Sequence, residues 1–266
     1  MEFSEYNLEK VQSIILEIFV EFDRICRKHN IPYSIEGGTM LGAYKYKGYV
    51  PWDDDIDVVM LRDAYDRFME IAPSELNEKF FLQNYHTVPE FPLTWAKICT
   101  NRAELWEHNY ENLPIHHGLF IDIFPIDYVC EKDFVAHVRR SGFLKACRFR
   151  KLGLLREKGI RGILRALYCM PRSLQRLTEE FEKEVRKHNA DADCTLAYEI
   201  CNPNQKFRPL PISYYTELSE LEFCGVRAMV SAHYKEFLEA RFGDLSKEPP
   251  IEKRKPSHGM KVKFFD

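Results

Sequence analysis

The chain has 266 residues, of which 45% are hydrophobic and 30% charged, and its formal net charge is −3. This composition is ordinary for a water-soluble globular protein. No apolar run approaches the roughly 20 residues that span a bilayer, and the acidic first thirty residues do not resemble a signal peptide. We therefore expect a cytoplasmic protein, free or peripheral on the inner face of the membrane.

Hydrophobic periodicity predicts alternating helices and strands through the first half of the chain. In chain order we expect a helix over 5–29, a strand over 33–36, a helix over 39–47, a strand over 55–61, a helix over 62–71, and strands over 80–85, 93–100 and 118–129. The last of these, GLFIDIFPIDYV, is the strongest strand signal in the sequence. From about residue 131 the pattern is helical to roughly residue 190, where prolines begin to interrupt it.

Four aspartates crowd against an apolar strand in GYVPWDDDIDVVM, residues 48–60. Asp55 and Asp57 are two positions apart, so on an extended strand they point to the same face. Two half-buried like charges repel each other, and a divalent cation relieves this repulsion. Asp122 lies between apolar neighbours in FIDIF, where an unpaired carboxylate would be costly. We predict a Mg²⁺ or Mn²⁺ site formed by these three acids.

The alternatives to this metal site for the acidic segment are a solvated turn and a calcium-binding loop. Asp53 and Asp54, taken alone, are typical of a solvated turn. A calcium-binding EF-hand loop is excluded, because Val58 and Ala64 occupy the positions that require Gly and Glu.

The segment before the aspartates offers groups for binding phosphate. Gly37 and Gly38 lead into a helix, so backbone N–H groups can approach an anion closely, and Thr39 can add a hydroxyl contact. A Gly-Gly pair alone is more often a simple turn. Lys97 and Arg102 are candidate cations for the phosphates, with mere solvation as the alternative.

Two further residues are candidates for substrate binding. Trp52 can stack on a base or on a quaternary ammonium group, or it can simply anchor the loop. His258 lies in the basic C-terminal segment, which either folds back on the substrate or forms a mobile tail.

The eight cysteines are scattered, with no C-x-x-C pair and no closely spaced histidine to complete a zinc site. We expect all eight to be reduced thiols, since a cytosolic chain of this size needs no disulfide.

A strongly basic stretch covers residues 137–176, with twelve Lys or Arg, one acid and interleaved apolar residues. This pattern is typical of an interfacial helix on an anionic membrane surface. A solvated helical face is the alternative, and nucleic acid, a third possible partner, is not expected.

The glycine turn, the acidic pair and the later acid together resemble the nucleotidyltransferase fold of the DNA polymerase beta type. The segments GGTMLGAYKYKGYVPWDDDID, GLFIDIFPID and ARFGDLSKEPPIEKR are similar to the LicD family of phosphotransferases, to which the fukutin-related proteins are also similar. The resemblance runs from about residue 25 to residue 258. It implies an α+β fold, with a small mixed sheet and flanking helices followed by a helical C-terminal part.

The resemblance implies two parts and a function. Residues 1–130 would form the nucleotidyltransferase-like catalytic core with its N-terminal helix, and residues 131–266 a mainly helical, basic part that completes the acceptor side and closes on the core. The expected activity is metal-dependent transfer of a phospho-substituent, with phosphocholine as the first choice, from a CDP-linked donor (CDP-choline or a CDP-polyol). The acceptor would be a sugar hydroxyl on a cell-surface glycan or a lipid-linked oligosaccharide.

The family likeness also implies roles for the candidate residues. Asp55, Asp57 and Asp122 would hold the metal that bridges the diphosphate, and Asp122 would either accept the hydroxyl proton or serve only as a ligand. Gly37, Gly38 and Thr39 would cradle the phosphates. The alternatives are a nucleotidyl- or glycosyltransferase that uses the same acids, and an inactive scaffold that binds membrane or glycan.

Overall fold

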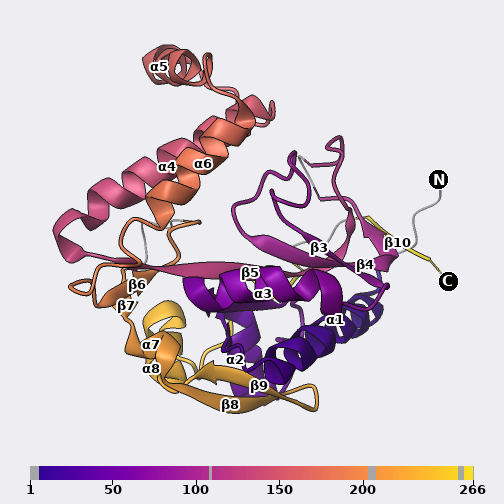
Figure 1. Cartoon of the computed structure of the whole chain (residues 1–266). Helices are drawn as coiled ribbons and strands as arrows, with labels where there is room; N and C mark the ends of the chain where they lie inside the picture. Colours follow the sequence, from indigo (N-terminus) through magenta and orange to yellow (C-terminus); the bar gives the residue numbers. More distant parts are fainter. Residues whose placement is uncertain (1–5, 108–109, 203–207, 257–260, 266) are drawn as a thin grey trace.

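A single mixed sheet runs through the molecule and helices cover it (Figure 1). The computed structural model describes residues 6–107, 110–202, 208–256 and 261–265. The strand order is β1-β2-β5-β4-β10, with β3 paired to β4, and with β6 pairing both β5 and β7. These strands are β1 (Ser34–Ile35), β2 (Asp57–Leu61), β3 (Phe80–Gln83), β4 (Ala96–Leu105), β5 (Gly118–Val129), β6 (Leu196–Tyr198), β7 (Leu210–Pro211) and β10 (Val262–Phe264).

The central strand is β5, whose bounds are those the sequence predicts. It pairs in parallel with β2, and antiparallel with β4 over its first half and with β6 over its last three residues. Pro125 lies between these two antiparallel segments, opposite Met60 of β2. Proline has no backbone N–H to donate to a neighbouring strand. It is therefore tolerated here, where the pairing with β4 has ended and the pairing with β6 has not yet begun.

Three helices from the first half cover the sheet or connect its strands. Helix α1 (Leu8–Lys28) is amphipathic; it begins at an Asn7 cap and buries residues at helical spacing, among them Ile18, Phe19 and Phe22. Helices α2 (Gly37–Tyr46) and α3 (Arg62–Glu75) flank β2 in the sequence. The expected order of elements is therefore confirmed through residue 129, with bounds shifted by a few residues.

Helices α4 (Phe134–Lys151), α5 (Gly159–Cys169) and α6 (Leu174–Val185) form an arm that rises from one end of the sheet. Figure 1 shows α4 and α6 lying side by side, with α5 at the far end, away from the rest of the molecule. Among the described residues, no helix combines the length and the apolar character that a membrane crossing requires.

The expectation of a mainly helical C-terminal part holds through α6 and is wrong beyond it. The later elements include a hairpin, β8 (Leu218–Phe223) and β9 (Val226–Ser231), with α7 (Ser213–Thr216) and α8 (Tyr234–Phe242) around it. The hairpin turns at Cys224 and Gly225, whose φ angles of 49° and 81° are typical of a tight two-residue turn. Strands β6 and β10 also join the main sheet. The α+β character is confirmed, whereas the division at residue 130 stays a prediction.

Candidate active site

Two of the predicted acids lie side by side. The parallel register of β2 and β5 pairs Asp57 with Asp122, and the Asp122 N–H donates to the carbonyl of Ile56 at 3.0 Å. Residues directly opposite each other on neighbouring strands share a face of the sheet. Sheet pairing thus brings together two carboxylates from distant parts of the sequence.

Burial and neighbouring acids make this position unfavourable for a bare carboxylate. Desolvation, followed by the negative charges of Asp122, Glu36 and Glu199, raises the pKa of Asp57 well above its usual value. A hard divalent cation between the two carboxylates would remove this penalty. Asp57 and Asp122 therefore fit the metal that the sequence predicts.

The remaining aspartates of the loop have distinct surroundings. Asp55 precedes β2 and is half-buried, and its charge is one of those that raise the pKa of Tyr49, after the larger effect of burial. Asp54 is only 4% exposed and accepts a hydrogen bond from the Tyr6 hydroxyl. The interpretation of Asp54 as part of a solvated turn is therefore wrong. Its partner is 48 residues away in the sequence, so local composition could not reveal it.

The glycine turn lies against the acids. Gly37 begins α2 with a φ of +58°, and a Cβ there would lie 3.5 Å from an Asp57 carboxylate oxygen. A Cβ on Gly38 would lie 2.3 Å from Asp53 Oδ2, so a larger residue there would displace the Asp53 side chain. The Thr39 hydroxyl accepts the N–H of Asp57 at 2.9 Å, which ties α2 to the first residue of β2.

The two predicted cations have carboxylate partners outside the acid pair. Lys97 is opposite Asp122 on β4, but its ammonium group bonds both Glu107 oxygens, at 2.8 and 2.9 Å, and lies over the Phe120 ring. Arg102 is five residues further along β4, about 16 Å at the usual rise, and pairs with Glu17 of α1 at 2.6 Å. The structure therefore does not bring Arg102 to the aspartates.

Trp52 and His258 are the last two predicted site residues. Trp52 lines a cavity of about 600 Å³ beside Gly38 and Asp53, with the Arg254 guanidinium 5.3 Å from its ring. Four lysines also line this cavity: Lys45, Lys247, Lys253 and Lys255. His258 lies outside the described residues.

One residue that touches the acid pair was missed at the sequence level. The Trp95 indole N–H donates to Asp122 Oδ1 at 2.6 Å, and the Lys145 ammonium group lies 4.8 Å from the Trp95 ring centre. Burial lowers the pKa of Lys145, which also donates to Asn202 at 2.8 Å. One signal for Trp95 was present in the sequence: it precedes Lys97 by two positions, on the same face of the predicted strand. Its hydrogen bond to Asp122 depends on the tertiary fold, so the sequence could not predict it.

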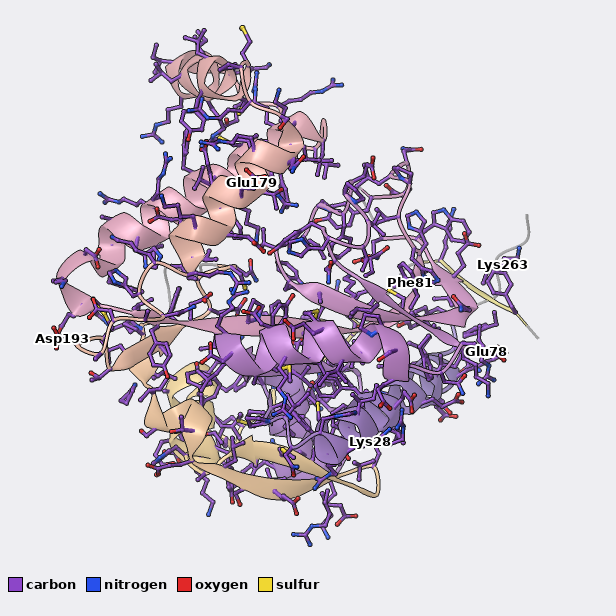
Figure 2. The ribbon with its side chains drawn as sticks, viewed as in Figure 1. Lys28, Glu78, Phe81, Glu179, Asp193 and Lys263 are labelled. Carbon is purple, nitrogen blue, oxygen red and sulfur yellow. A yellow bond between two sulfur atoms is a disulfide. The ribbon has the colours of Figure 1, made fainter. Side chains whose placement is uncertain are left out.

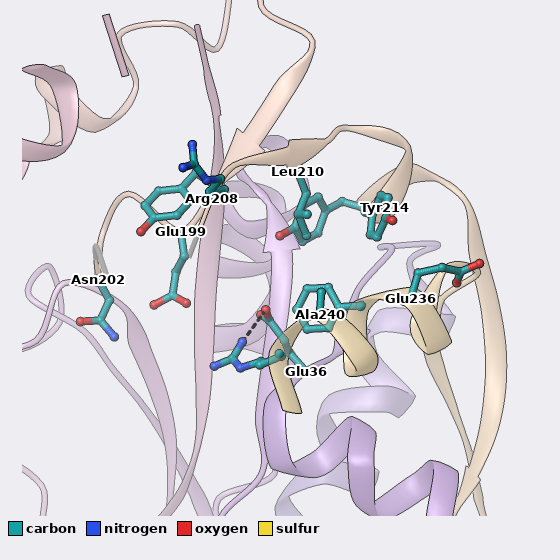
Figure 3. A pocket seen from close by; sticks show the side chains of 12 residues that line it. Glu36, Glu199, Asn202, Arg208, Leu210, Tyr214, Glu236 and Ala240 are labelled. Carbon is teal, nitrogen blue, oxygen red and sulfur yellow. Dashed lines mark hydrogen bonds and ion pairs between the residues drawn. The ribbon is translucent and has the colours of Figure 1, made fainter. Parts of the chain in front are cut away.

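A second cavity, of about 380 Å³, opens beside the glycine turn and was not foreseen. Figure 3 shows the carboxylates of Glu36 and Glu199 turned toward the same space. Glu36 pairs with Arg241 at 3.2 Å, and Glu199 Oε1 is buried with no hydrogen-bond partner among the described residues. Burial, then the charge of Glu36, raises the pKa of Glu199 to about 8. Four aromatic residues complete much of the wall: Tyr198, Tyr214, Tyr215 and Phe237.

The signal for Glu199 was present in the sequence. It lies in AYEIC, an acid between apolar neighbours like Asp122, but the segment around it contains no strong strand or motif. Arg241 belongs to the ARFGDLS segment, which carried part of the family resemblance without assigning that arginine a role.

The basic stretch 137–176 divides into a buried and an exposed part. Arg148 is fully buried, and its guanidinium donates to the carbonyls of Phe91 and Pro92. It therefore holds α4 against the loop between β3 and β4, and its guanidinium is not part of the exposed surface. On α5 and at its C-terminal cap, by contrast, five apolar side chains are between 55% and 72% exposed: Ile160, Ile163, Leu164, Leu167 and Met170.

Comparisons with known proteins agree with the motifs. Residues 30–148 match the family model described as LicD/FKTN/FKRP, nucleotidyltransferase domain. The chain is 28% identical, over 95% of its length and 96% of the relative's, to the lipopolysaccharide cholinephosphotransferase LicD of Haemophilus influenzae. Shorter matches, 34% and 30% identical over 24% and 26% of the chain, link it to uncharacterized proteins of Rickettsia typhi and Rickettsia prowazekii, covering 21% and 26% of those proteins.

Proposed function

Because this chain belongs to the LicD family, we propose that it transfers phosphocholine from CDP-choline to a sugar hydroxyl of a cell-surface or lipid-linked glycan. The observation that carries the proposal is the pairing of Asp57 with Asp122 beside the glycine turn. The name of the Haemophilus influenzae relative supports both the transferred group and a lipopolysaccharide acceptor. In this proposal the sheet from β1 to β5 is a nucleotidyltransferase-like core.

Metal dependence is part of the proposal. Asp55, Asp57 and Asp122 would hold Mg²⁺ or Mn²⁺, which supplies positive charge to the donor diphosphate when bound. The raised pKa of Asp57 supports this assignment, because its burial beside Asp122 is costly without a cation. Thr39 holds Asp57 at the start of β2, and Trp95 orients the Asp122 carboxylate through its indole N–H.

The positions of the two cavities suggest how the donor lies. Gly37 is near Asp57 and Arg241, toward the smaller cavity, whereas Gly38 lines the larger one. We place the diphosphate at the turn and the cytidine monophosphate end in the larger cavity, where Trp52 and the lysines offer stacking and positive charge.

The quaternary ammonium group of choline would then occupy the smaller cavity. Tyrosine and phenylalanine rings line it, and Glu199 presents a buried oxygen to which no residue in the described part of the chain donates a hydrogen bond. A trimethylammonium group has no N–H to donate, so it is held by charge and by aromatic faces. An uncharged polyol would gain neither, and we therefore favour choline over ribitol or glycerol.

The reaction is an in-line substitution at phosphorus. The acceptor sugar oxygen forms a bond to the phosphorus that carries choline, and the bond from that phosphorus to the CMP oxygen breaks. The hydroxyl proton passes to Asp122 as the new bond forms. Lysine and arginine side chains around the turn would offset the charge that develops on the departing CMP.

A donor panel tests this assignment. The full chain is incubated with Mg²⁺, a glycan acceptor and, in turn, CDP-choline, CDP-ribitol, CDP-glycerol, UDP-sugars or CTP, and released CMP, UDP or pyrophosphate is measured. We expect CMP from CDP-choline. Glu199→Gln should reduce kcat/KM for that donor about tenfold or more, since opposite charges about 4 Å apart in a protein attract each other by up to about 4 kcal/mol.

Glu236→Gln is the matched control, because Glu236 lines the same cavity from an exposed position. It should change kcat/KM less than about twofold. Release of UDP or pyrophosphate instead of CMP would favour a glycosyl- or nucleotidyltransferase. No release from any donor would favour a binding scaffold.

We also propose that α5 rests on an anionic membrane surface on the cytoplasmic side. Lys158 and Arg161 lie beside its exposed apolar face. Figure 2 shows the side chains of α5 projecting away from the rest of the molecule. The combination is typical of an interfacial helix. Such a position would bring the active site near a lipid-linked acceptor.

Vesicle sedimentation checks the membrane proposal. Binding to vesicles that contain phosphatidylserine should exceed binding to pure phosphatidylcholine. The double variant Leu164→Ser, Leu167→Ser should bind the phosphatidylserine vesicles about tenfold or more weakly. Each substitution removes a leucine whose burial in the membrane would contribute about 1.5 kcal/mol or more to binding. Val20→Ser, at an exposed apolar position on α1, should have no effect. Equal binding by all three proteins would contradict the proposal.

A further inference from the structure

A second group of metal-ligating side chains lies at the other end of β5, outside the proposed active site. Cys130 directly follows β5, and His188, Asp191 and Cys194 lie in the loop between α6 and β6. The four ligand atoms all lie within 4.8 Å of one another. Cys130, His188 and Cys194 are no more than 6% exposed. Sequence spacing did not indicate this cluster, because Cys130 lies about 60 residues before the other three.

Three of the six distances between the ligand atoms match those of a tetrahedral zinc centre. The Cys130 sulfur lies 3.6 Å from His188 Nδ1 and 3.7 Å from Asp191 Oδ2, and the latter two atoms are 3.7 Å apart. Zinc bonds of about 2.0–2.3 Å at tetrahedral angles place ligand atoms roughly 3.3–3.8 Å apart. Two sulfurs, one imidazole nitrogen and one carboxylate oxygen form a closed ligand set for this metal.

The surroundings of His188 support the same conclusion. Its Nε2 is 3.0 Å from Asp133 Oδ1, so the ring is held with Nδ1 turned toward the sulfur. A metal-bound histidine usually has its other ring nitrogen fixed by a carboxylate in this way. Lys187 also pairs with Asp133 and keeps that carboxylate in place.

The structure joins the sulfurs of Cys130 and Cys194 as a disulfide, whereas the other six cysteines are free. A disulfide alone gives no reason for an imidazole and a carboxylate to converge on the same two sulfurs. The geometry points to a structural zinc site in which Cys130 and Cys194 are thiolates and His188 and Asp191 complete the coordination. Asp191 is 34% exposed, which gives the ion a path from solvent.

The site would join the arm to the central strand. Asn189, next to His188, donates to Asp127 at 2.7 Å and accepts the N–H of Tyr128 at 2.8 Å, both on β5. Zinc would fix this same loop, which contains the Asp193 labelled in Figure 2, to Cys130, the residue that follows β5. It would stabilise the fold and take no part in the transfer reaction, since all four positions are filled by protein.

The test counts metal and thiols in the full chain, purified anaerobically without chelator or reductant. We expect about one equivalent of zinc by elemental analysis and, in denaturant, eight titratable thiols. Six thiols and no zinc, with no uptake after reduction and addition of ZnCl₂, would establish the disulfide and overturn the proposal.

Variants separate the site from a general effect on folding. Cys194→Ser should lose the zinc, and Cys224→Ser, at an exposed cysteine elsewhere, should retain it. Because Cys194→Ser also changes a buried side chain, Asp133→Asn serves as the second variant. It leaves all four ligands in place and should lower the affinity for zinc about 10–100-fold, measured by competition with a coloured chelator. Unchanged zinc affinity in Asp133→Asn, or retained zinc in Cys194→Ser, would contradict the site.

Discussion

Replacing Asp57 with asparagine is expected to reduce CMP release from CDP-choline by about 10³-fold or more, because metal charge at a phosphoryl group is worth several kcal/mol. The amide has the shape of the carboxylate but lacks its charge. Initial rates at saturating Mg²⁺ measure the loss. Asp63→Asn, an exposed change at the start of α3, is the control and should keep normal activity.

The same variant should be more stable than the natural protein when no metal is present. The pKa of Asp57 is raised in the folded state, chiefly by burial and then by Asp122. A raised carboxyl pKa favours the folded state below about pH 4, and this contribution is lost as pH rises through the folded pKa. The melting temperature of the metal-free protein should therefore fall with rising pH, and less steeply in Asp57→Asn.

Mg²⁺ should raise the melting temperature of the natural protein and leave that of Asp57→Asn nearly unchanged. Full activity of the variant, or an equal response of both proteins to Mg²⁺, would show that Asp57 is not a ligand.

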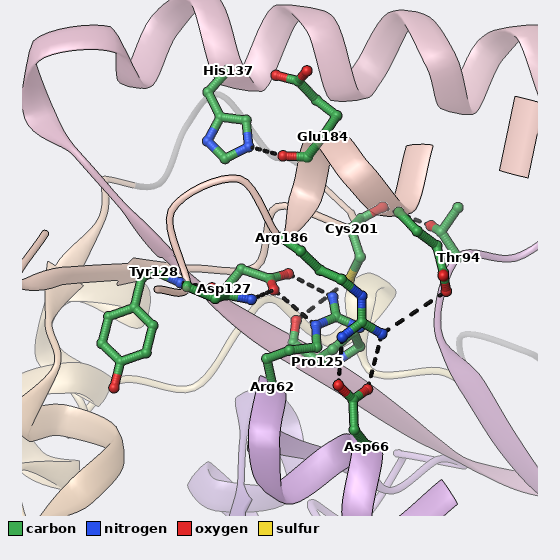
Figure 4. A network of polar contacts seen from close by, with 12 residues as sticks. Arg62, Asp66, Thr94, Pro125, Asp127, Tyr128, His137, Glu184, Arg186 and Cys201 are labelled. Atoms are coloured by element: carbon green, nitrogen blue, oxygen red, sulfur yellow. Dashed lines mark hydrogen bonds and ion pairs between the residues drawn. The ribbon is translucent and has the colours of Figure 1, made fainter. Parts of the chain in front are cut away.

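The largest stability loss is expected at the other acid of β5. The Arg62 guanidinium bonds both oxygens of Asp127, at 2.8 and 2.6 Å, and the two side chains are 4% and 0% exposed (Figure 4). Asp127→Ala would leave Arg62 buried and unpaired, which typically costs about 3–5 kcal/mol. That is a large part of the roughly 5–15 kcal/mol that stabilises a domain.

Urea unfolding measures this loss of stability. Two further variants serve as references for its size. Glu179→Gln, which breaks an exposed contact with Arg176, should cost less than about 1 kcal/mol. Arg62→Met combined with Asp127→Leu should recover much of the stability, because both buried charges are removed together. A cost below about 1 kcal/mol for Asp127→Ala would mean that water enters and solvates Arg62.

Asp122 and Asp127 illustrate how far the sequence could lead. Both are acids within one apolar strand, and the strand itself was predicted to the residue. They are five positions apart, so they point to opposite faces. One meets Asp57 and the other meets Arg62, and no local pattern distinguishes these outcomes, because each partner lies about 65 residues away.

The same reason explains what else the sequence did not foresee. The Lys97 ammonium group pairs with Glu107, whose approach depends on the loop after β4, and its contact with the phosphates stays a prediction. Arg148 belongs to a stretch whose sequence resembles a basic surface, but its side chain is fully buried beneath α4. Periodicity located the elements of the first half well, since each follows from its own residues. Side-chain partners across the sheet follow from pairings that only the folded chain defines.

The parallel pairing of β2 with β5 also couples catalysis to the last stages of folding. Parallel strands cannot be joined by a tight turn, and here the connection contains α3, β3 and β4. Contacts between such distant segments form late, after the local helices. An incomplete chain, in which helices have formed but β5 has not docked, would hold the two acids apart and leave the proposed site unformed. Under the proposed function, turnover would thereby be confined to molecules that have finished folding.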